Sequence, residues 1–268
     1  MKYTRLGQHF LKNKAAIRLI IDTLNLRQGD TVIEVGPGHG ELTKPLFEDM
    51  RALDGKLICI ERDAVLLNQI AQDIRYPNLV LKQGDALALL PELITAFKQQ
   101  KTPYKIVGNI PYYITGHLLR ILGEVNPKPE ISVFTIQREV AERITAVPPK
   151  MNLLAATSQF WAKITIISFL SHRDFSPQPK VDSAIISCTP RVRDPLASYP
   201  HYFFLVRAAF KQPRKTLLNN LAAAFPQKTR EELTTFISSA DIDPLCRPQN
   251  LSVEHLKKLS KIVYNGNI

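Results

Sequence analysis

Short β-rich runs alternate with longer segments of helical character between residues 31 and 137, and this alternation constrains the fold more than any other feature of the chain. It is typical of βαβ units, which build a parallel sheet covered by helices on both faces. Two later β-rich runs are joined by a loop too short for a crossover helix, so we expect them to form an antiparallel hairpin at the sheet edge. The chain is therefore predicted to be an α/β protein with a mainly parallel, seven-stranded sheet. The predicted strands comprise residues 31–35, 57–61, 79–81, 105–107, 131–136, 164–170 and 183–189.

The composition changes where Pro190, Pro195 and Pro200 punctuate the chain, because no strand-like alternation follows them. Four helical patterns come next, separated by residues that commonly limit helices. We therefore predict two domains, an α/β domain over residues 1–194 and a small all-helical domain over residues 195–268. The four predicted helices comprise residues 202–211, 214–225, 229–239 and 252–263.

The formal net charge of +11 is carried by the two ends of the chain. Residues 1–18 contain five basic residues and no acidic one, whereas residues 19–190 contain 18 of each sign. Residues 191–268 contain 12 basic and 6 acidic residues. A polyanionic partner accounts for this distribution, and nucleic acid is the commonest one. The alternative is a basic surface that only keeps the protein in solution.

Several classes of protein are disfavoured by composition. Cys59, Cys188 and Cys246 lie far apart and form no CxxC pair, which argues against a disulfide framework and a zinc site. The histidines have no metal-ligand spacing, so we expect no metal. No apolar run approaches the roughly 18 residues that span a bilayer, and no secretory signal is visible at the start. We therefore expect a cytoplasmic protein without a membrane segment.

Three predicted strands are each followed by residues suited to an adenosine-bearing ligand. Gly36, Gly38 and Gly40 follow the first strand, where bare backbone lets a ligand approach the strand ends. Glu61 ends the second strand and can accept hydrogen bonds from both ribose hydroxyls. Asp85 follows the third strand and can accept one from an adenine amine. The spacing G-x-G-x-G departs from the dinucleotide fingerprint, so we expect S-adenosylmethionine rather than a nicotinamide cofactor.

The fourth strand ends in Asn109, Ile110, Pro111 and Tyr112, a sequence of the [DNS]-P-P-[YF] type that resembles amino methyltransferases. The lone pair of an adenine N6 is delocalised into the ring, so this nitrogen is a poor nucleophile. The amide oxygen of Asn109 and the carbonyl of Ile110 can accept its two N–H bonds and aim the lone pair at a methyl group. Pro111 fixes the backbone between them, and Tyr112 offers a face on which an extruded base can stack. These four residues are the predicted catalytic residues, acting through orientation rather than as a strong base.

Together these residues resemble the ribosomal RNA adenine dimethyltransferase family, in particular its bacterial small-subunit branch. The resemblance extends over nearly the whole chain in six blocks. These are similar to the family's G-Q-N-F-L (residues 7–11), E-x-G-P-G-x-G (34–40), N-L-P-Y-N-I-S (109–115), Q-[KR]-E-x-x-x-R (137–143), F-x-P-x-P-K-V-D-S-A (175–184) and R-R-K-T-[LI]-x-N (around 214–220).

The resemblance implies a Rossmann-like class I S-adenosylmethionine-dependent methyltransferase fold with a C-terminal rRNA-binding helical domain. It implies dimethylation of N6 of two adjacent adenines in the hairpin loop near the 3′ end of small-subunit (16S) rRNA, linked to small-subunit maturation. The partner is the small ribosomal subunit, and we expect a monomer. The implied cofactor-binding residues are His9, Leu11, Gly36, Gly38, Glu61, Asp85 and Asn109. The implied RNA-binding residues are Phe175, which would stack on the target base, and Arg214 and Lys215 in the helical domain.

The chain departs from the family pattern at four places. His9 and Tyr113 each replace an asparagine, and Pro213 interrupts the double arginine. The family's Y-G-x-L-S is missing from residues 147–156. Two alternatives remain open at this point: a ribosome-assembly factor with secondary methylation, and a large-subunit rRNA adenine methyltransferase of the erythromycin-resistance type. A nicotinamide-dependent dehydrogenase is a more distant third.

Overall fold

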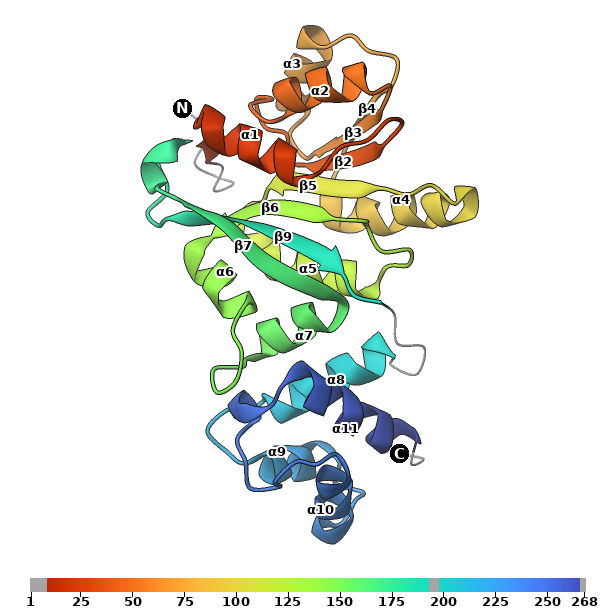
Figure 1. The fold of residues 1–268 in the computed structure, drawn as a ribbon, viewed down its shortest axis with the longest axis vertical. Helices are drawn as coiled ribbons and strands as arrows, with labels where there is room; N and C mark the ends of the chain where they lie inside the picture. The colour runs from red at the N-terminus through yellow and green to blue at the C-terminus, as the bar shows by residue number, and fades with distance from the viewer. Residues whose placement is uncertain (1–8, 193–197, 266–268) are drawn as a thin grey trace. The chain divides into compact units, whose positions relative to one another are not determined.

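The computed structural model describes residues 9–192 and 198–265, and these form two compact units (Figure 1). The first unit comprises Met1–Ala141 and Ile164–Pro190, and the second comprises Glu142–Lys163 and Arg191–Ile268. The predicted domain boundary, at residues 194 and 195, lies outside the described residues. A helical segment within residues 142–163 belongs with the C-terminal helices rather than with the sheet.

The first unit is built around a sheet of seven strands within the described residues, which confirms the predicted α/β class and strand number. The strand order is β4-β3-β2-β5-β6-β9-β7. The first five strands in this order pair in parallel, and β9 pairs antiparallel with β6. β7 and β9 are neighbours at one edge, where the sequence predicts a hairpin. The bounds are β2 (Thr31–Val35), β3 (Lys56–Glu61), β4 (Leu79–Gln83), β5 (Lys105–Asn109), β6 (Ser132–Gln137), β7 (Ala162–Leu170) and β9 (Ser183–Pro190).

The strand order reverses between β2 and β5. From β2 the chain moves outward through β3 to β4, then returns to β5 on the other side of β2. Ligands bind outside the carboxyl ends of the strands at such a switch point. The two strands approach closely there: a Cβ atom on Gly108 would lie 2.5 Å from the carbonyl oxygen of Val35. Glycine at this position therefore allows the ends of β2 and β5 to meet.

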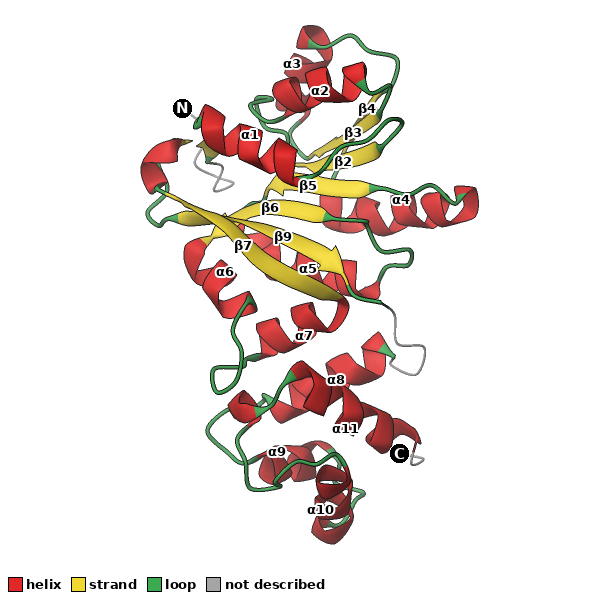
Figure 2. Cartoon of the chain, viewed as in Figure 1, coloured by secondary structure: helices red, strands yellow, loops and turns green. Residues whose placement is uncertain are grey.

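Helices cover both faces of the sheet (Figure 2). Two of them begin at a carboxylate two residues after the end of a strand: Asp63 caps α3 by accepting from Val65 N, and Asp85 caps α4 by accepting from Leu87 N. α1 begins after Asn13, whose side chain accepts from Ala16 N. The helices of this unit are α1 (Lys14–Thr23), α2 (Thr43–Ala52), α3 (Ala64–Asp73), α4 (Ala86–Gln100), η2 (Tyr112–Ile114) and α5 (Thr115–Glu124).

The core of this unit explains why its strands read as continuous apolar runs. One layer joins α1 and α2 to one face of the sheet, for example through Ile20, Met50 and Leu57. The alternate strand residues, such as Ile58 and Ile106, belong to the opposite face of the sheet and are equally buried there. A parallel sheet buried on both faces requires this pattern, in contrast to the alternation of a half-exposed sheet.

A two-stranded sheet joins the N-terminal segment to the loop between β7 and β9. β1 (Phe10–Leu11) pairs antiparallel with β8 (Phe175–Ser176). Lys12 N adds a hydrogen bond to the carbonyl oxygen of Asp174, at 2.7 Å. Residues 9–12, called the N-terminal arm below, are therefore held by backbone pairing to a segment more than 160 residues later in the chain.

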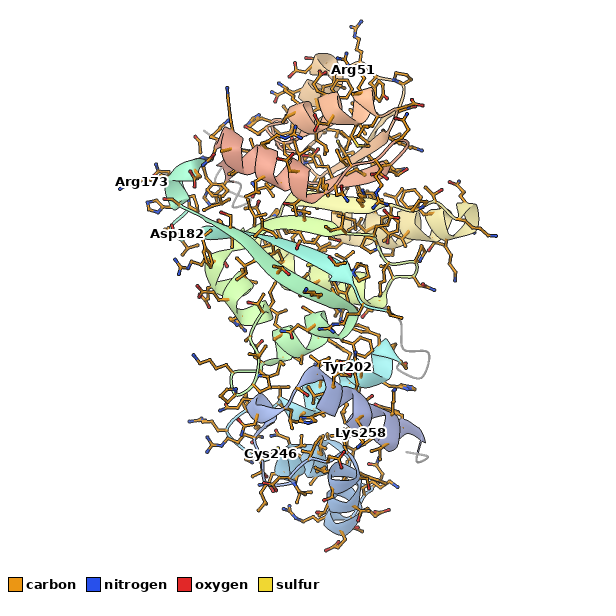
Figure 3. All side chains as sticks on the ribbon, in the orientation of Figure 1. Arg51, Arg173, Asp182, Tyr202, Cys246 and Lys258 are labelled. Atoms are coloured by element: carbon orange, nitrogen blue, oxygen red, sulfur yellow. The ribbon has the colours of Figure 1, made fainter. Side chains whose placement is uncertain are left out.

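The second unit is helical and has its own core. Tyr202 is fully buried there, and its hydroxyl donates to the carbonyl oxygen of Ala156 at 3.0 Å (Figure 3). Thr229 and Glu232 form a capping box that begins α10, close to the predicted start. Thr216 caps α9, so that helix begins later than predicted. The helices of the second unit are α7 (Leu153–Trp161), α8 (Tyr199–Ala209), α9 (Leu217–Ala224), α10 (Arg230–Ser239), η4 (Pro248–Asn250) and α11 (Val253–Asn265). α6 (Arg138–Ile144) has residues in both units, and η3 (His172–Asp174) precedes β8 in the first unit. Among all of the described helices, none combines the length and apolarity needed to cross a membrane.

Candidate active site

A cleft opens at the carboxyl ends of β2, β3 and β5, at the switch point of the sheet. Its empty volume is about 850 Å³, a figure that includes the open solvent at its mouth. The structure brings most of the predicted site residues together here although they are spread over a hundred residues of sequence. Those in the cleft wall are His9, Gly36, Gly38, Glu61, Asp85, Asn109, Ile110, Pro111 and Tyr112.

Glu61 ties the glycine-rich loop to the end of β3. One carboxylate oxygen accepts from Gly38 N at 3.2 Å, and the other accepts from Asp63 N at 3.0 Å. The residue is only 5% exposed, yet it lines the cleft. Each carboxylate oxygen can accept more than one hydrogen bond, so this rigidly held group retains acceptor capacity toward a ligand.

Gly38 has φ of +60°, a left-handed conformation that favours glycine. A Cβ atom there would lie 2.6 Å from a ring carbon of Phe10 in the N-terminal arm. The Phe10 ring also contacts the His39 ring, with centroids 4.5 Å apart. Lys12, also in the arm, forms a 2.6 Å ion pair with Glu41, which directly follows the glycine-rich loop. The arm therefore closes over the glycine-rich loop, and the bare backbone of Gly38 makes this approach possible.

Asp85 has a structural role in addition to its position in the cleft. One of its carboxylate oxygens caps α4, and the residue is exposed. The sequence predicts Asp85 as an acceptor for an adenine amine, and its other carboxylate oxygen is not used in the cap. The position of the residue thus follows from helix capping as much as from ligand binding.

The side chain of Asn109 has a defined orientation. Its amide nitrogen donates to the backbone carbonyl oxygen of His9 at 2.6 Å, a short bond that joins β5 to the N-terminal arm. Because the nitrogen is engaged in this way, the amide oxygen is the atom left to accept from a ligand in the cleft. The backbone of Ile110 is fixed as well, because its N–H donates to Thr135 on β6 at 3.0 Å.

Tyr112 follows Pro111 as the first residue of η2 and is held at two points. Its hydroxyl lies 2.9 Å from Oγ of Ser183, the first residue of β9. Its ring stacks against the imidazole of His9, with centroids 5.9 Å apart and an interplanar angle of 29°. Burial raises the pKa of the Tyr112 phenol above its ordinary value, so the side chain is a neutral hydroxyl at neutral pH.

Four predicted residues lie outside the cleft wall. Leu11 and Phe175 are each 3% exposed, pair across β1 and β8, and belong to the core rather than to the cleft wall. Phe10, which the sequence analysis did not select, lines the cleft instead. Arg214 and Lys215 are exposed residues of the second unit, directly before the Thr216 cap of α9.

Several other residues were not selected from the sequence. Ser183 contacts Tyr112 but does not line the cleft, and nothing in the spacing of residues 175–184 links that serine to Tyr112. Tyr113 is 65% exposed at the cleft wall and was noted only as a departure from the family. The remaining unselected wall residues are Val35, Ile60, Arg62, Gly84, Ala86 and Ile114.

A buried acid lies behind the glycine-rich loop. Glu34 on β2 is 1% exposed, and burial raises the pKa of its carboxyl from its ordinary value to about 7. The thiol of Cys59 donates to it at 3.5 Å from β3. Burial also raises the pKa of Cys59, which is therefore a protonated thiol. No cluster of three or more His, Cys, Asp or Glu side chains that could hold a metal occurs in the described part of the chain.

The cleft fits an adenosine-bearing cofactor such as S-adenosylmethionine. A rigid carboxylate, Glu61, is available to the ribose hydroxyls, and Ile60 and Ala86 supply apolar walls for a purine. Because the glycine-rich loop lacks side chains, a cofactor can approach its backbone closely. Asn109 lies in the same wall.

Comparison with known proteins identifies the family of the chain. A sequence model described as ribosomal RNA adenine dimethylase matches residues 1–263. The ribosomal RNA small subunit methyltransferase A of Dehalococcoides mccartyi is 38% identical over 265 residues, covering 98% of this chain and 88% of that protein. The protein of the same name from Chromohalobacter salexigens is 35% identical over 268 residues, covering 97% and 90%.

Solved structures share the fold. A dimethyladenosine transferase from Plasmodium falciparum has a TM-score of 0.76 at 26% identity, covering 94% of this chain and 96% of that one. The 23S rRNA methyltransferase ErmE has a TM-score of 0.68 at 23% identity, covering 95% and 99%, and shows a likeness of fold alone. From the family match over nearly its full length and the close relatives, the chain belongs to the ribosomal RNA adenine dimethylase family.

Proposed function

We propose that this enzyme dimethylates N6 of two adjacent adenines in the hairpin loop near the 3′ end of small-subunit rRNA, with S-adenosylmethionine as methyl donor. As a ribosomal RNA adenine dimethylase, it is an rRNA adenine N6-dimethyltransferase. The choice of the small subunit follows relatives at 35–38% identity that bear the name ribosomal RNA small subunit methyltransferase A. The choice of the 3′-terminal hairpin rests on the motif resemblance.

The observation that carries the proposal is the orientation of the Asn109 amide. Its nitrogen donates to the carbonyl oxygen of His9 at 2.6 Å, so its oxygen is the atom that can accept from the target amine. An exocyclic amine such as adenine N6 carries two N–H donors and matches two acceptors, the Asn109 oxygen and the Ile110 carbonyl. Both acceptors are neutral and cannot take up a proton at neutral pH, so they orient the amine rather than deprotonate it. Rate then arises from alignment of the nitrogen lone pair.

The cofactor supplies an electrophilic methyl group on a sulfonium centre. In this proposal Glu61 accepts from its ribose hydroxyls, Asp85 accepts from its adenine amine, and the Gly36–Gly38 backbone lies against it. Phe10 and His9 of the N-terminal arm limit the access of water to the same region. Leu11 supports the arm from the core rather than by contact with the cofactor.

The target adenine must leave its stack to reach Asn109. Tyr112 supports this step, since aromatic stacking of an extruded base contributes about 1–3 kcal/mol. The basic second unit, with exposed Arg214 and Lys215, provides sequence-independent contacts to rRNA phosphates. One chain supplies both the cofactor site and the basic surface, so we propose that it acts as a monomer in the cytoplasm and contributes to small-subunit maturation.

The proposal is tested by methyl transfer from labelled S-adenosylmethionine to small subunits that lack the modification, with large subunits in parallel. We expect label in the small-subunit rRNA only, mapped to two adjacent N6,N6-dimethyladenosines in the 3′-terminal hairpin. Label in large-subunit rRNA would indicate the erythromycin-resistance type instead. Tight binding to small subunits without label would favour an assembly factor with secondary methylation.

A further inference from the structure

The loop between α8 and α9 carries exposed cations on a short stretch of chain (Figure 1). This segment, residues 211–216, is called the α8–α9 loop below. Lys211, Arg214 and Lys215 are all exposed in it. In the described part of the chain, the ion pairs of the second unit are formed by other cations, such as Lys228. The positive charges of this loop are therefore available to an anionic partner.

The loop contains a turn at the proline that departs from the family pattern. Lys215 N donates to the carbonyl oxygen of Gln212 at 2.9 Å, so that Pro213 and Arg214 are the two central residues of a four-residue turn. Proline is favoured at the first central position, because its ring fixes the backbone angle that this position requires. Pro213 therefore replaces one arginine of the family's R-R-K pattern by a residue that stiffens the backbone next to the remaining cations.

A buried amide on α9 holds the same loop. Asn220 is 3% exposed, and its amide oxygen accepts from Gln212 N at 2.9 Å. Its amide nitrogen donates to the carbonyl oxygens of Gln212 and Thr216, at 3.0 and 3.1 Å. Burial of an amide costs free energy unless its polar atoms are paired, and here both the nitrogen and the oxygen are paired with the loop backbone. The amide thus fixes the loop on both sides of the turn.

The backbone of the α8–α9 loop is therefore constrained twice, by a proline within it and by a side chain from the following helix. A loop that is mobile before binding loses conformational freedom when it binds, and this loss lowers its affinity. A loop that is already ordered avoids the loss and binds more tightly with the same number of charges.

We propose that Asn220 and Pro213 are positioning residues for rRNA binding, which order the α8–α9 loop in advance so that Arg214 and Lys215 contact rRNA phosphates from a fixed backbone. The inference rests on the proposed function, in which these two cations bind rRNA. Neither Asn220 nor Pro213 touches the RNA, because each acts through the cations beside it. A chain that lacks one arginine of the family pattern thus gains affinity from the order of its loop.

The test uses the full-length enzyme with Asn220→Ala or Pro213→Ala. Each substitution is made in the wild type and in the Arg214→Ala/Lys215→Ala background. Three quantities are measured: the Kd for unmodified small subunits at several salt concentrations, the single-turnover rate of methyl transfer at saturating subunits and cofactor, and amide hydrogen exchange at Gln212. Thr229→Ala removes the cap of α10 in the same unit and is the control for lost stability.

We expect Asn220→Ala to raise the Kd for small subunits about fivefold or more, and Pro213→Ala to raise it about two- to fivefold. Exchange at Gln212 should be faster in Asn220→Ala. The transfer rate at saturation should stay within about twofold of the wild type, since the cleft is unchanged. The slope of log K against log salt should also stay within about 0.5 of the wild type, because both variants keep their cations.

The Arg214→Ala/Lys215→Ala background separates positioning from a general effect on the fold. Without the two cations, neither Asn220→Ala nor Pro213→Ala should raise the Kd by more than about twofold further. A rise that persists in this background, or an equal rise in Thr229→Ala, would overturn the inference. So would an Asn220→Ala variant with faster exchange at Gln212 and the wild-type Kd. If Asn220→Ala does not fold, Pro213→Ala decides by the same comparison, since Pro213 is exposed.

These outcomes are distinguishable from failure of the proposed function. If the wild-type enzyme places no dimethyladenosine in the 3′-terminal hairpin, the proposed function fails before any variant is compared. If the wild type does so and Arg214→Ala/Lys215→Ala binds small subunits as the wild type does, the methylation stands and the role of the α8–α9 loop is rejected.

Discussion

The hydroxyl of Tyr112 and Oγ of Ser183 lie 2.9 Å apart, which links the end of β5 to the start of β9 across an interval of 71 residues. Ser183 is fully buried and pairs with Gln137 in the β6–β9 ladder, so its position is set by the sheet. Tyr112 is only partly buried and follows a proline turn. The serine therefore fixes the rotation of a ring that would otherwise turn about its own side-chain bonds.

Removing this bond should slow transfer without weakening cofactor binding. For Ser183→Ala we expect a rate about three- to tenfold lower, because one hydrogen bond contributes about 0.5–1.5 kcal/mol net. Single-turnover transfer at saturating S-adenosylmethionine measures this effect. Tyr112→Phe should slow transfer by a similar factor, and the double variant by no more than either single one. Fully additive losses would show that the two residues act separately.

The amide orientation of Asn109 leads to a second prediction. Asn109→Asp replaces the nitrogen that donates to the His9 carbonyl by an acceptor, so two oxygens would face each other at a separation that is 2.6 Å in the wild type. We expect Asn109→Asp and Asn109→Ala both to reduce transfer by at least a hundredfold. Both variants lose the bond to the His9 carbonyl and should loosen the N-terminal arm, measured as faster amide hydrogen exchange at residues 9–11, and the aspartate variant more so because it adds repulsion between two oxygens. Wild-type exchange in both variants would contradict the assigned bond.

Binding of small subunits gives the control for these variants. The proposed rRNA contacts lie in the second unit, so subunit affinity should stay within about twofold of the wild type. An inactive variant that also fails to bind would indicate a folding defect rather than loss of an acceptor.

Much of the cleft could be predicted from sequence because parallel strands end at a common edge. Gly36, Glu61, Asp85 and Asn109 each follow a recognisable strand, and topology alone brings strand ends together at a switch point. The strand number and the α/β class followed from the same alternation. Here local pattern and tertiary structure agree, so the position of the site needed no knowledge of side-chain packing.

The features that sequence did not predict depend on contacts between distant segments. Nothing in the local sequence shows that Phe175 turns inward to pair with Leu11, or that Ser183 reaches Tyr112. Both follow from the insertion of β9 between β6 and β7 and from the docking of the arm on β8. The helical segment within residues 142–163 was missed as part of the second unit for the same reason, since it packs with helices more than forty residues later.

The contact between Gly38 and Phe10 predicts a specific effect on cofactor affinity. Gly38→Ala places a Cβ atom where the Phe10 ring lies, at 2.6 Å in the present geometry, and should displace the arm from the cleft. We expect the Kd for S-adenosylmethionine to rise about tenfold or more, measured by calorimetry. Gly29→Ala is a matched control, because Gly29 also has positive φ (+75°) but has no atom within 4 Å of the added Cβ. Both variants should lose a similar amount of stability, about 1 kcal/mol, from the strained backbone.

If Gly29→Ala weakens cofactor binding as much as Gly38→Ala does, backbone strain is the cause and the arm is not part of the cofactor site. If neither variant changes the Kd, the cofactor does not depend on closure of the arm.

Exposed cations before α9 are expected to contact rRNA phosphates. The double variant Arg214→Ala/Lys215→Ala should weaken binding to small subunits and reduce the slope of log K against log salt by about 1 to 2, as for the loss of two phosphate contacts. Arg75→Ala/Lys98→Ala removes the same charge from exposed positions in the first unit and serves as the control. The slope is measured from equilibrium binding at several salt concentrations. Equal slopes for the two double variants would mean that net charge, rather than a local contact, governs binding.

The buried carboxyl of Glu34 predicts how stability depends on pH. Its pKa is about 7 in the folded protein against an ordinary value of 4.5, because burial disfavours the charged form. The folded state therefore holds a proton that the unfolded chain has lost between these values, so the free energy of unfolding falls as pH rises from 4.5 to 7 and stays lower above it. Over this interval the free energy of unfolding falls by about 3 kcal/mol in total, at roughly 1.4 kcal/mol per pH unit.

Glu34→Gln removes this titration but keeps the shape of the side chain. Urea unfolding of the two proteins should give similar free energies near pH 4.5, and the variant should become the more stable one by about 3 kcal/mol above pH 7. Taking the difference between the two proteins cancels the titration of the remaining groups. A difference that stays constant over this interval would mean that Glu34 is ionised in the folded state. A difference that grows with pH would identify this carboxyl as a neutral hydrogen-bonding group behind the glycine-rich loop.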